Sequence, residues 1–265
     1  MVTQTIANDI SKLANNQAVA GFTRLDLKSL ALLLDVDGTM IDIAPSPTEV
    51  HVSDELQSSL GRLVELTGGA LALVSGRPIA DLDRLFEPLK LPAIGGHGAE
   101  MRLSAGGATK RIADLPKAMR EQLTGAATPG SGIVVEDKGY SLALHYRNAP
   151  QQKEYLRSHI EAGCAAFPGE ATAVLPGKAM FEVMRPGIDK GQGVRELMRH
   201  APFAGRVPVF IGDDVTDESV FAMLPEMGGK GFSVSRRFAG LSGIFESPAQ
   251  VRRALLELSA GGSKL

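Results

Sequence analysis

The chain has 265 residues, of which 44% are hydrophobic and 22% charged, and its formal net charge is −2 at neutral pH. This composition is typical of a globular protein with one or two domains and a sizeable core. The charge balance argues against a nucleic-acid-binding protein, and the low aromatic content without Trp argues against a stacking platform for single strands.

The cysteine count and the hydropathy pattern exclude further classes. The single cysteine, Cys164, cannot form an internal disulfide or a zinc site built from several cysteines. No run approaches the roughly 18 apolar residues of a membrane span. Residues 1–16 lack the basic-then-apolar pattern of a secretory signal. We therefore expect a cytoplasmic protein with no membrane partner.

The first part of the chain predicts alternating strands and helices. We expect residues 1–27 to be a polar N-terminal extension with a short helix around Asp9–Leu13, and residues 28–106 to form the first part of a core domain. Buried strands and amphipathic helices then alternate, as in a parallel sheet covered on both faces. The expected elements are a strand at Ser29–Asp35, a helix capped by Ser53 and ended by Gly68-Gly69, a strand at Ala70–Val74, and a helix from Ile79 to Phe86.

Residues 107–183 show a different pattern. A helix followed by two strands occurs twice, which predicts an inserted α+β cap with an antiparallel sheet. Such a sheet can keep one face open, which suits a lid. The expected elements are helices near Pro116–Leu123 and at Gln151–Phe167, and strands at Ile133–Glu136, Tyr140–Arg147, Ala171–Leu175 and Ala179–Met184.

The parallel pattern resumes over residues 184–265, the second part of the core. The fold class is therefore α/β, with a Rossmann-like parallel-sheet core and an inserted α+β cap domain. Pro208 is unfavourable inside its strand because it has no N–H to donate. The expected elements are helices at Lys190–His200, Thr216–Met223 and Pro248–Ser259, and strands at Arg206–Gly212 and Phe232–Ser235.

Two carboxylates follow the first strand, at Asp35 and Asp37. Their two-residue spacing points them the same way, and like charges about 4 Å apart repel by roughly 4 kcal/mol at an effective dielectric near 20. A proton or a divalent cation must offset that repulsion. Gly38, which lies between Asp37 and Thr39, permits a tight turn. The ordinary alternative is a polar turn at a strand end.

Three further polar segments also lie at the end of a strand or at the start of a helix. Ser75 follows the second strand, Lys190 opens a helix, and Asp213, Asp214 and Asp217 follow a later strand. Each has an ordinary explanation by itself: a helix start, an exposed lysine, or acids that cap a helix. Together they place hydroxyl, amine and carboxylate groups where open α/β sheets bind ligands, and the oxygen ligands suit Mg²⁺.

This order of motifs resembles the haloacid dehalogenase-like (HAD) phosphohydrolases, and the insert between Ser75 and Lys190 resembles their type 2 cap. Within that superfamily the chain looks like the trehalose-6-phosphate phosphatase family. The resemblance covers about Leu30–Ser259, and Met40, where the family often has Leu, is a minor departure. The supporting segments are Ser75–Pro78, Gly96–Glu100, Val135–Tyr140, Leu144–Arg147, Gly177–Glu182 and Arg185-Pro186.

The resemblance implies a mechanism. Asp35 is the expected nucleophile, forming an aspartyl-phosphate. Asp37 would protonate the leaving sugar oxygen and then take a proton from water. Mg²⁺ is expected on the Asp35 side chain, the Asp37 backbone carbonyl and Asp213, with Asp214 as a further ligand or neighbouring acid.

The resemblance also implies phosphate and sugar contacts. Ser75 and Lys190 would hold the phosphoryl oxygens, and Asp217 would orient Lys190. Arg77 and His97 are expected to contact substrate, with His97 not expected to act as an acid or base. The expected sugar ligands in the cap are Glu136, Lys138, Arg147 and Glu182, with Lys178 and Arg185 as secondary candidates.

Several alternatives remain open at this point. The cap side chains could simply pair with one another on a solvated sheet face. The enzyme could act on sucrose phosphate or mannosyl-phosphoglycerate in place of trehalose 6-phosphate, or be a phosphohexomutase. An Asp-phosphorylated signalling receiver or a non-catalytic metal binder would also use clustered acids. The expected partner is a small sugar phosphate, with no nucleic acid, and the sequence is compatible with a monomer.

Overall fold

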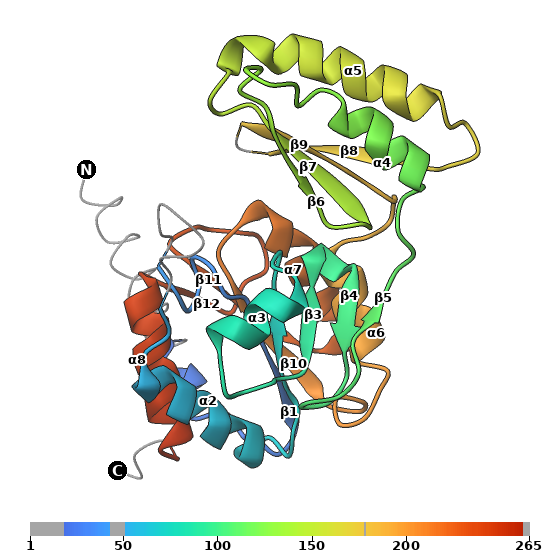
Figure 1. The fold of residues 1–265 in the computed structure, drawn as a ribbon. Coiled ribbons are helices and arrows are strands. Elements are labelled where there is room, and N and C mark those ends of the chain that lie inside the picture. Colours follow the sequence, from blue (N-terminus) through green and yellow to red (C-terminus); the bar gives the residue numbers. More distant parts are fainter. Residues whose placement is uncertain (1–18, 43–50, 178, 262–265) are drawn as a thin grey trace, which may run out of the picture. The chain divides into compact units, whose positions relative to one another are not determined.

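The computed structural model describes residues 19–42, 51–177 and 179–261, and the chain divides into two compact units (Figure 1). The core unit contains Met1–Lys110 and Asp189–Leu265, and the cap unit contains Arg111–Ile188. The helix expected around Asp9–Leu13 and the candidate Lys178 lie outside the described residues. No helix in the described ranges has the length and hydropathy needed to span a bilayer.

The core unit is built on a mainly parallel sheet, which confirms the predicted fold class. Within the described ranges, eight strands are ordered β12-β11-β10-β1-β2-β3-β4-β5. Neighbours from β12 to β3 are parallel, whereas β3 and β4 are antiparallel. The strands are β1 (Leu30–Leu34), β2 (Leu71–Val74), β3 (Ala93–Gly95), β4 (Glu100–Arg102), β5 (Lys110–Arg111), β10 (Val207–Gly212), β11 (Lys230–Val234) and β12 (Gly243–Phe245).

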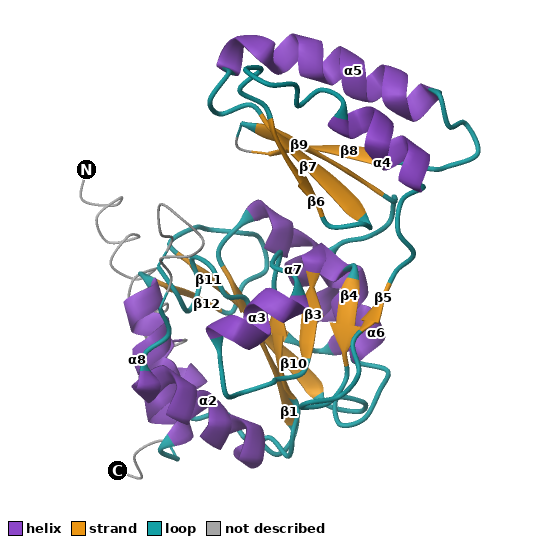
Figure 2. Ribbon diagram, viewed as in Figure 1, coloured by secondary structure: helices purple, strands orange, loops and turns teal. Residues whose placement is uncertain are grey.

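Helices cover both faces of this sheet (Figure 2). One hydrophobic cluster joins α2 (Asp54–Leu66), α3 (Ile79–Leu85) and α8 (Pro248–Ser259) to Leu32 of β1. The other joins α6 (Lys190–Leu197) and α7 (Glu218–Met223) to Leu33, the next residue of β1. Because successive side chains of a strand point to opposite faces, a strand between two helix layers must be apolar throughout.

Local signals explain where the first long helix begins and ends. The Ser53 side chain accepts a hydrogen bond from the Leu56 N–H at 3.3 Å and caps α2. Gly68 and Gly69 follow α2 with φ of 59° and 89°. These left-handed conformations favour glycine and turn the chain directly into β2.

Pro208 occupies β10, a central strand, and the register shows why it is tolerated. Val207 donates its N–H to the Ser29 carbonyl oxygen of the β1 side at 3.1 Å, so the nitrogen of the next residue faces β11. Pairing with β11 starts only at Val209, opposite Lys230. The ladder therefore loses no hydrogen bond at Pro208. Four strands were not predicted, namely β3, β4, β5 and β12, which have only two or three residues each.

The described end of the N-terminal extension joins the core. Phe22 is fully buried, and its ring meets those of Phe232 and Phe245 edge-on at centroid distances of 5.3 and 5.6 Å. Edge-to-face pairs of this kind add to the burial of apolar area. Residues 19–27 are thus less separate from the core than the expected polar extension implied.

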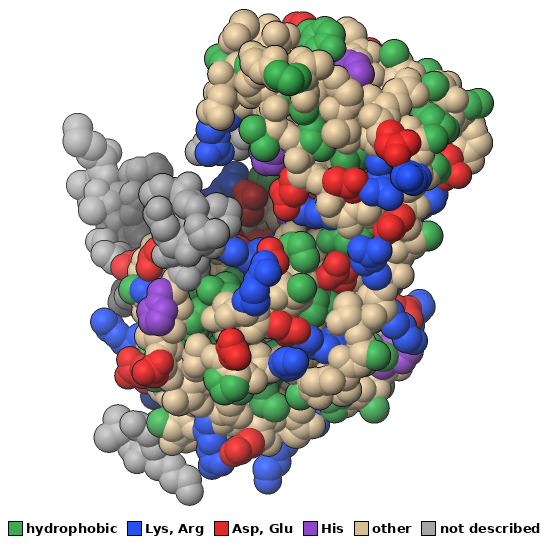
Figure 3. Space-filling view, in the orientation of Figure 1, with side chains coloured by type: hydrophobic (Ala, Val, Ile, Leu, Met, Phe, Trp, Pro, Cys, Tyr) green, Lys and Arg blue, Asp and Glu red, His purple; other side chains and the backbone are tan. Residues whose placement is uncertain are grey.

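On the visible face of the core unit, acidic and basic side chains are interspersed (Figure 3).

The cap unit is an antiparallel sheet with helices on one face. The strand order is β6-β7-β9-β8, and Leu142, Leu144 and Val183 pack against α4 and α5. On the other face, Ala143 pairs with Glu136 on one side and Glu182 on the other. The elements are β6 (Val134–Asp137), β7 (Ser141–His145), β8 (Ala173–Gly177), β9 (Met180–Met184), α4 (Lys117–Thr124) and α5 (Lys153–Ala165).

Candidate active site

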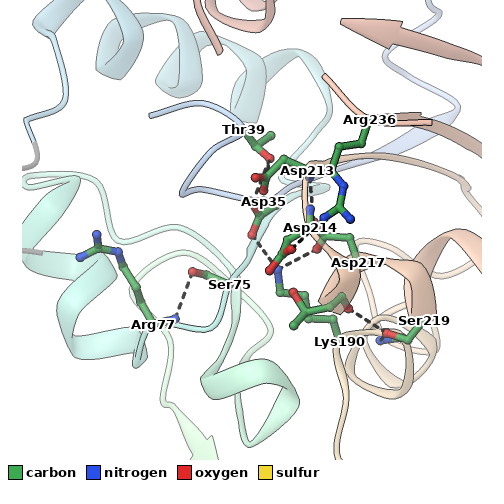
Figure 4. A network of polar contacts seen from close by, with 12 residues as sticks. Asp35, Thr39, Ser75, Arg77, Lys190, Asp213, Asp214, Asp217, Ser219 and Arg236 are labelled. Carbon is green, nitrogen blue, oxygen red and sulfur yellow. Dashed lines mark hydrogen bonds and ion pairs between the residues drawn. The ribbon is translucent and has the colours of Figure 1, made fainter. Parts of the chain in front are cut away.

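Polar side chains converge at one edge of the core sheet, where three neighbouring strands end. Asp35 follows β1, Ser75 follows β2 and Asp213 follows β10. Lys190, the first residue of α6, reaches the same place (Figure 4). The carboxyl ends of parallel strands lie together, so residues far apart in sequence become neighbours.

The Lys190 ammonium joins two buried carboxylates. Its Nζ donates to Asp35 Oδ1 and to Asp217 Oδ1, both at 2.7 Å, and all three side chains are almost completely buried. Burial by itself would lower the pKa of Lys190, but the two carboxylates raise it, so the amine stays charged. Lys190 is therefore a fixed positive charge facing the nucleophile candidate.

Asp35 and Asp213 lie on either side of the Thr39 hydroxyl. Thr39 Oγ1 donates to Asp35 Oδ2 at 2.9 Å and lies 3.4 Å from Asp213 Oδ1. Gly38 has a φ of 78°, and a Cβ at that position would collide with the Asp213 carboxylate. Only glycine lets the two acidic segments approach this closely.

Burial and mutual repulsion shift the pKa values of these acids. Burial raises the pKa of Asp35 to about 8, with Asp217 and Asp213 raising it and Lys190 lowering it. Burial likewise raises the pKa of Asp213 to about 6, with Asp217 and Asp214 adding to the increase. Both carboxyls would ionise more readily beside an additional positive charge.

The cluster suits a metal ion. One carboxylate oxygen from each of Asp35, Asp213 and Asp217 lies within 4.8 Å of the others. Asp217 is already engaged, because its Oδ1 accepts from Lys190 and its Oδ2 from the backbone N–H groups of Asp213 and Asp214. Asp35 and Asp213 are thus the side chains best placed to hold the ion. Three carboxylates facing one ammonium leave a negative charge that a hard divalent cation would neutralise.

Asp37 and Ser75 are linked through Arg77. The Arg77 guanidinium donates to both oxygens of Asp37, at 2.6 and 2.7 Å. Hydrogen bonding to Asp37 raises the pKa of Arg77, although burial lowers it. The Arg77 backbone N–H donates to Ser75 Oγ at 3.1 Å. Arg77 was expected among the substrate contacts, and in the structure its side chain pairs with Asp37.

Two other candidates sit at the margin of the cluster. Asp214 is half exposed, and its Oδ1 accepts a hydrogen bond from Arg236 at 3.2 Å. His97 lies in the turn after β3 with a φ of 56°, and its N–H donates to the Ser75 carbonyl oxygen at 3.1 Å. A Cβ on Gly76 would collide with the His97 ring, so the ring lies against the Ser75 loop.

The cap unit carries a separate group of charged side chains on its open sheet face. Lys138 Nζ lies 3.8 Å from Glu136 Oε1 and 3.9 Å from Glu182 Oε1. Glu182 is only 9% exposed and accepts from Ser141 Oγ at 2.9 Å. His145 Nε2 lies 3.9 Å from Glu136. These groups do pair with one another, as the ordinary alternative predicted, but Glu182 and Lys138 are more buried than a solvated face requires.

The other two described cap candidates are Arg147 and Arg185. Arg147 is exposed. Arg185 forms an ion pair with Glu170 at 2.9 Å and donates to the Asp114 carbonyl oxygen at 3.2 Å. The structure thus brings together Glu136, Lys138 and Glu182, and gives Arg185 a different set of partners.

Some contacts were not assigned from the sequence. Thr39 lies directly after Asp37 and Gly38 in the sequence, so its position was a usable signal. Arg236, which holds Asp214, and Ser141, which holds Glu182, carried no signal, because their partners lie 22 and 41 residues away. Only the folded chain reveals these pairs.

Comparisons with known proteins agree with the geometry. The sequence model of the trehalose-phosphatase family matches residues 33–242. The trehalose-6-phosphate phosphatase of Escherichia coli is 37% identical over 236 residues, which cover 85% of this chain and 87% of that protein. The probable trehalose-phosphate phosphatase of Sinorhizobium fredii is 37% identical over 231 residues, covering 86% of each.

Solved structures show the same fold. The C-terminal domain of C. albicans trehalose-6-phosphate phosphatase has a TM-score of 0.73 at 22% identity, covering 93% of this chain and 97% of that one. A trehalose-6-phosphate phosphatase related protein has a TM-score of 0.70 at 23% identity, covering 87% and 97%. At these identities the likeness concerns the fold alone.

The buried ion pairs predict a pH-dependent stability change for Lys190→Met. We expect the free energy of unfolding to fall by about 3–5 kcal/mol above the pKa of Asp35, because removing one partner leaves bare buried carboxylates. Folding raises the pKa of Asp35 to about 8. The stability that the raised pKa of Asp35 contributes is therefore lost as the pH rises through about 8. Because Lys190 lowers this pKa, its removal makes the ionised form of Asp35 more costly to bury. The loss of stability in Lys190→Met should therefore be larger at about pH 9 than at about pH 5.

Denaturant unfolding in the presence of a chelator measures this difference. Arg195→Met is the matched control on the same helix, because Arg195 pairs with Glu226 at the surface. It should change the free energy of unfolding by less than about 0.5 kcal/mol at either pH. A Lys190→Met penalty that is constant or smaller at high pH would contradict the account.

Proposed function

The chain belongs to the trehalose-phosphatase family, and from that membership and the site geometry we propose that it hydrolyses trehalose 6-phosphate to trehalose and inorganic phosphate with Mg²⁺ as cofactor. The observation that carries the proposal is the buried cluster of Asp35, Lys190, Asp217 and Asp213 at the carboxyl edge of the sheet. The substrate is inferred from the relatives, which are trehalose-phosphate phosphatases.

In the first step, Asp35 acts as the nucleophile. A carboxylate oxygen of Asp35 forms a bond to phosphorus while the bond from phosphorus to the sugar oxygen breaks, giving an aspartyl-phosphate. Lys190 supports this role because its fixed charge lies 2.7 Å from Asp35 Oδ1. Ser75 and Lys190 hold the phosphoryl oxygens and stabilise the negative charge that develops on them.

Asp37 moves the protons in both steps. It gives a proton to the departing sugar oxygen, and in the second step takes one from the water whose oxygen attacks phosphorus and breaks the bond to Asp35. Because Arg77 occupies both Asp37 oxygens, Arg77 must release one of them before Asp37 can transfer a proton.

Asp35 and Asp213 are the proposed side-chain ligands of Mg²⁺. The Asp37 backbone carbonyl is the proposed third ligand, and Asp214 is a further ligand or a neighbouring acid. When bound there, the ion would neutralise part of the carboxylate charge and so reduce the repulsion between Asp35 and a dianionic ester. Asp217 keeps Lys190 and the Asp213 segment in place through hydrogen bonds of 2.7 and 2.8 Å.

The sugar contacts are proposed to come from the cap unit. Glu136, Lys138 and Glu182 offer acceptors and donors that sugar hydroxyls bind well. Arg147 is exposed and carries further donors, and His97 borders the Ser75–Pro78 loop. We also propose that the protein is cytoplasmic and acts as a monomer.

A substrate panel with and without metal tests the proposed activity. Trehalose 6-phosphate should release phosphate at least about tenfold faster, by kcat/KM, than sucrose 6-phosphate or glucose 6-phosphate, because one lost charged hydrogen bond costs about 1.5–3 kcal/mol. A chelator should abolish release and Mg²⁺ should restore it. Equal rates on all the sugar phosphates would contradict the proposed substrate. Phosphate release in the presence of chelator would contradict the proposed metal cofactor.

Asp35→Asn and Asp37→Asn should fail in different ways. Asp35→Asn removes the nucleophile, and we expect turnover to fall by roughly 10⁴-fold or more without phosphoenzyme. Asp37→Asn keeps the nucleophile but slows the second step, so a phosphorylated chain should accumulate. Rapid quench with intact-protein mass spectrometry distinguishes the two. Asp26→Asn, an exposed change, is the control, and phosphoenzyme in Asp35→Asn would contradict the assignment.

Glu182→Gln tests the sugar site separately from the phosphate site. The change keeps the size and an acceptor for Ser141 but removes the charge, so KM for trehalose 6-phosphate should rise roughly ten- to hundredfold. Hydrolysis of p-nitrophenyl phosphate, which has no sugar, should be unaffected. Glu154→Gln, an exposed change on α5, is the matched control. An unchanged KM would remove Glu182 from the sugar site.

A further inference from the structure

Glu100, which ends the Gly96–Glu100 segment after the substrate candidate His97, has no assigned role in the reaction, although this segment lies against the phosphate loop, Ser75–Pro78. The Gly96 N–H donates to the Arg77 carbonyl oxygen at 2.9 Å, and the His97 N–H donates to the Ser75 carbonyl oxygen at 3.1 Å. The loop that carries Ser75 and Arg77 is thus held by the backbone of the turn between β3 and β4.

Glu100 adds a side-chain hydrogen bond to these backbone contacts. It is 9% exposed on β4, and its Oε2 accepts from the Ile79 N–H at 2.6 Å. Ile79 begins α3, and the preceding Pro78 caps it with no side-chain acceptor. The Glu100 carboxylate therefore performs the capping that the helix sequence lacks, and its charge suits the positive end of the helix dipole.

The backbones of the two segments approach each other closely at Gly95. Gly95, which pairs with Glu100 across the hairpin, has no side chain at the contact. A Cβ there would lie 2.9 Å from the Ile79 nitrogen and 3.0 Å from the Arg77 carbonyl oxygen. This close backbone approach transmits any shift at Glu100 directly to the loop.

We propose that Glu100 is a positioning residue for the phosphoryl-transfer site. By holding Ile79, it holds the backbone of Arg77 two residues earlier and, through the loop, the Ser75 hydroxyl. It does not itself touch the substrate. The inference rests on the proposed function, because it takes Ser75 and Arg77 to be part of the reaction site.

The alternative is that Glu100 only stabilises the fold, and the same two elements provide a control for that. Asp83 of α3 pairs with Arg102 of β4 through two hydrogen bonds, one of them 2.8 Å long. Asp83→Ala therefore removes a contact between the same strand and the same helix. It leaves the hydrogen bond from Ile79 to Glu100 in place.

Three substitutions at Glu100 distinguish the effect of its side-chain length from the effect of its negative charge. Glu100→Gln keeps the length and a carbonyl acceptor for the Ile79 N–H but loses the charge. Glu100→Asp keeps the charge but is one methylene too short to reach. Glu100→Ala loses both. For each variant, the measurements are Tm, kcat and KM with p-nitrophenyl phosphate and with trehalose 6-phosphate, and Ki for inorganic phosphate.

We expect Glu100→Ala and Glu100→Asp to lower kcat roughly ten- to hundredfold on both esters, because small misplacements of catalytic groups cost this much. Ki for phosphate should rise in the same two variants. Glu100→Gln should stay within about threefold of wild type, as its acceptor can hold Ile79. Asp83→Ala should lower Tm while kcat and Ki stay within about twofold.

Several outcomes would overturn the proposal. These are wild-type kcat and Ki in a folded Glu100→Asp, an Asp83→Ala that loses as much kcat as Glu100→Ala, or a Glu100→Gln that fails to fold. The result is separable from that of the proposed function. If the wild type hydrolyses p-nitrophenyl phosphate but no sugar phosphate, the proposed substrate fails while the Glu100 comparison still runs on the simple ester.

Discussion

The ammonium of Lys190, buried between Asp35 and Asp217, is the contact on which the rest of the site depends. Three carboxylates cannot share a dry sheet edge without positive charge, because desolvation and mutual repulsion both oppose their ionised forms. One lysine offsets only part of that charge, which is why burial still raises the pKa of Asp35 to about 8. The negative charge that Lys190 leaves uncompensated favours binding of a divalent cation at this edge. Such a cation would stabilise the buried carboxylates and would also serve the proposed reaction.

Around that contact, each functional group is held by a neighbour from another part of the chain. Asp217 is fixed by two backbone N–H groups, Asp37 by Arg77, and Thr39 stands between Asp35 and Asp213. The loop between β2 and α3 is held in turn by the hairpin of β3 and β4 through Glu100. Such support would keep the proposed reacting groups within the narrow positional tolerance that phosphoryl transfer requires.

The cap unit follows a different plan. Its two helices bury one face of a four-stranded antiparallel sheet, and the other face carries Glu136, Lys138 and Glu182 in mutual contact. Antiparallel sheets can present one polar face in this way, whereas the core sheet, covered on both faces, can offer ligands only at its strand ends. The division matches the proposed division of labour, with phosphate chemistry on the core and sugar contacts on the cap.

The sequence by itself determined the fold class, the long elements and the order of the acidic, hydroxyl and amine motifs. Apolar runs and helical periodicity depend on local spacing, which is why β1, α2 and α8 were predictable, and α2 also with its Ser53 cap and its Gly68-Gly69 end. Only the tertiary structure decided which groups meet: Lys190 reaches Asp35 across 155 residues, Arg77 turns to Asp37, and Glu100 caps a helix that begins 21 residues earlier. Three-residue strands such as β3 and β4 are too short to show a period, and pairings between distant residues are created by chain folding.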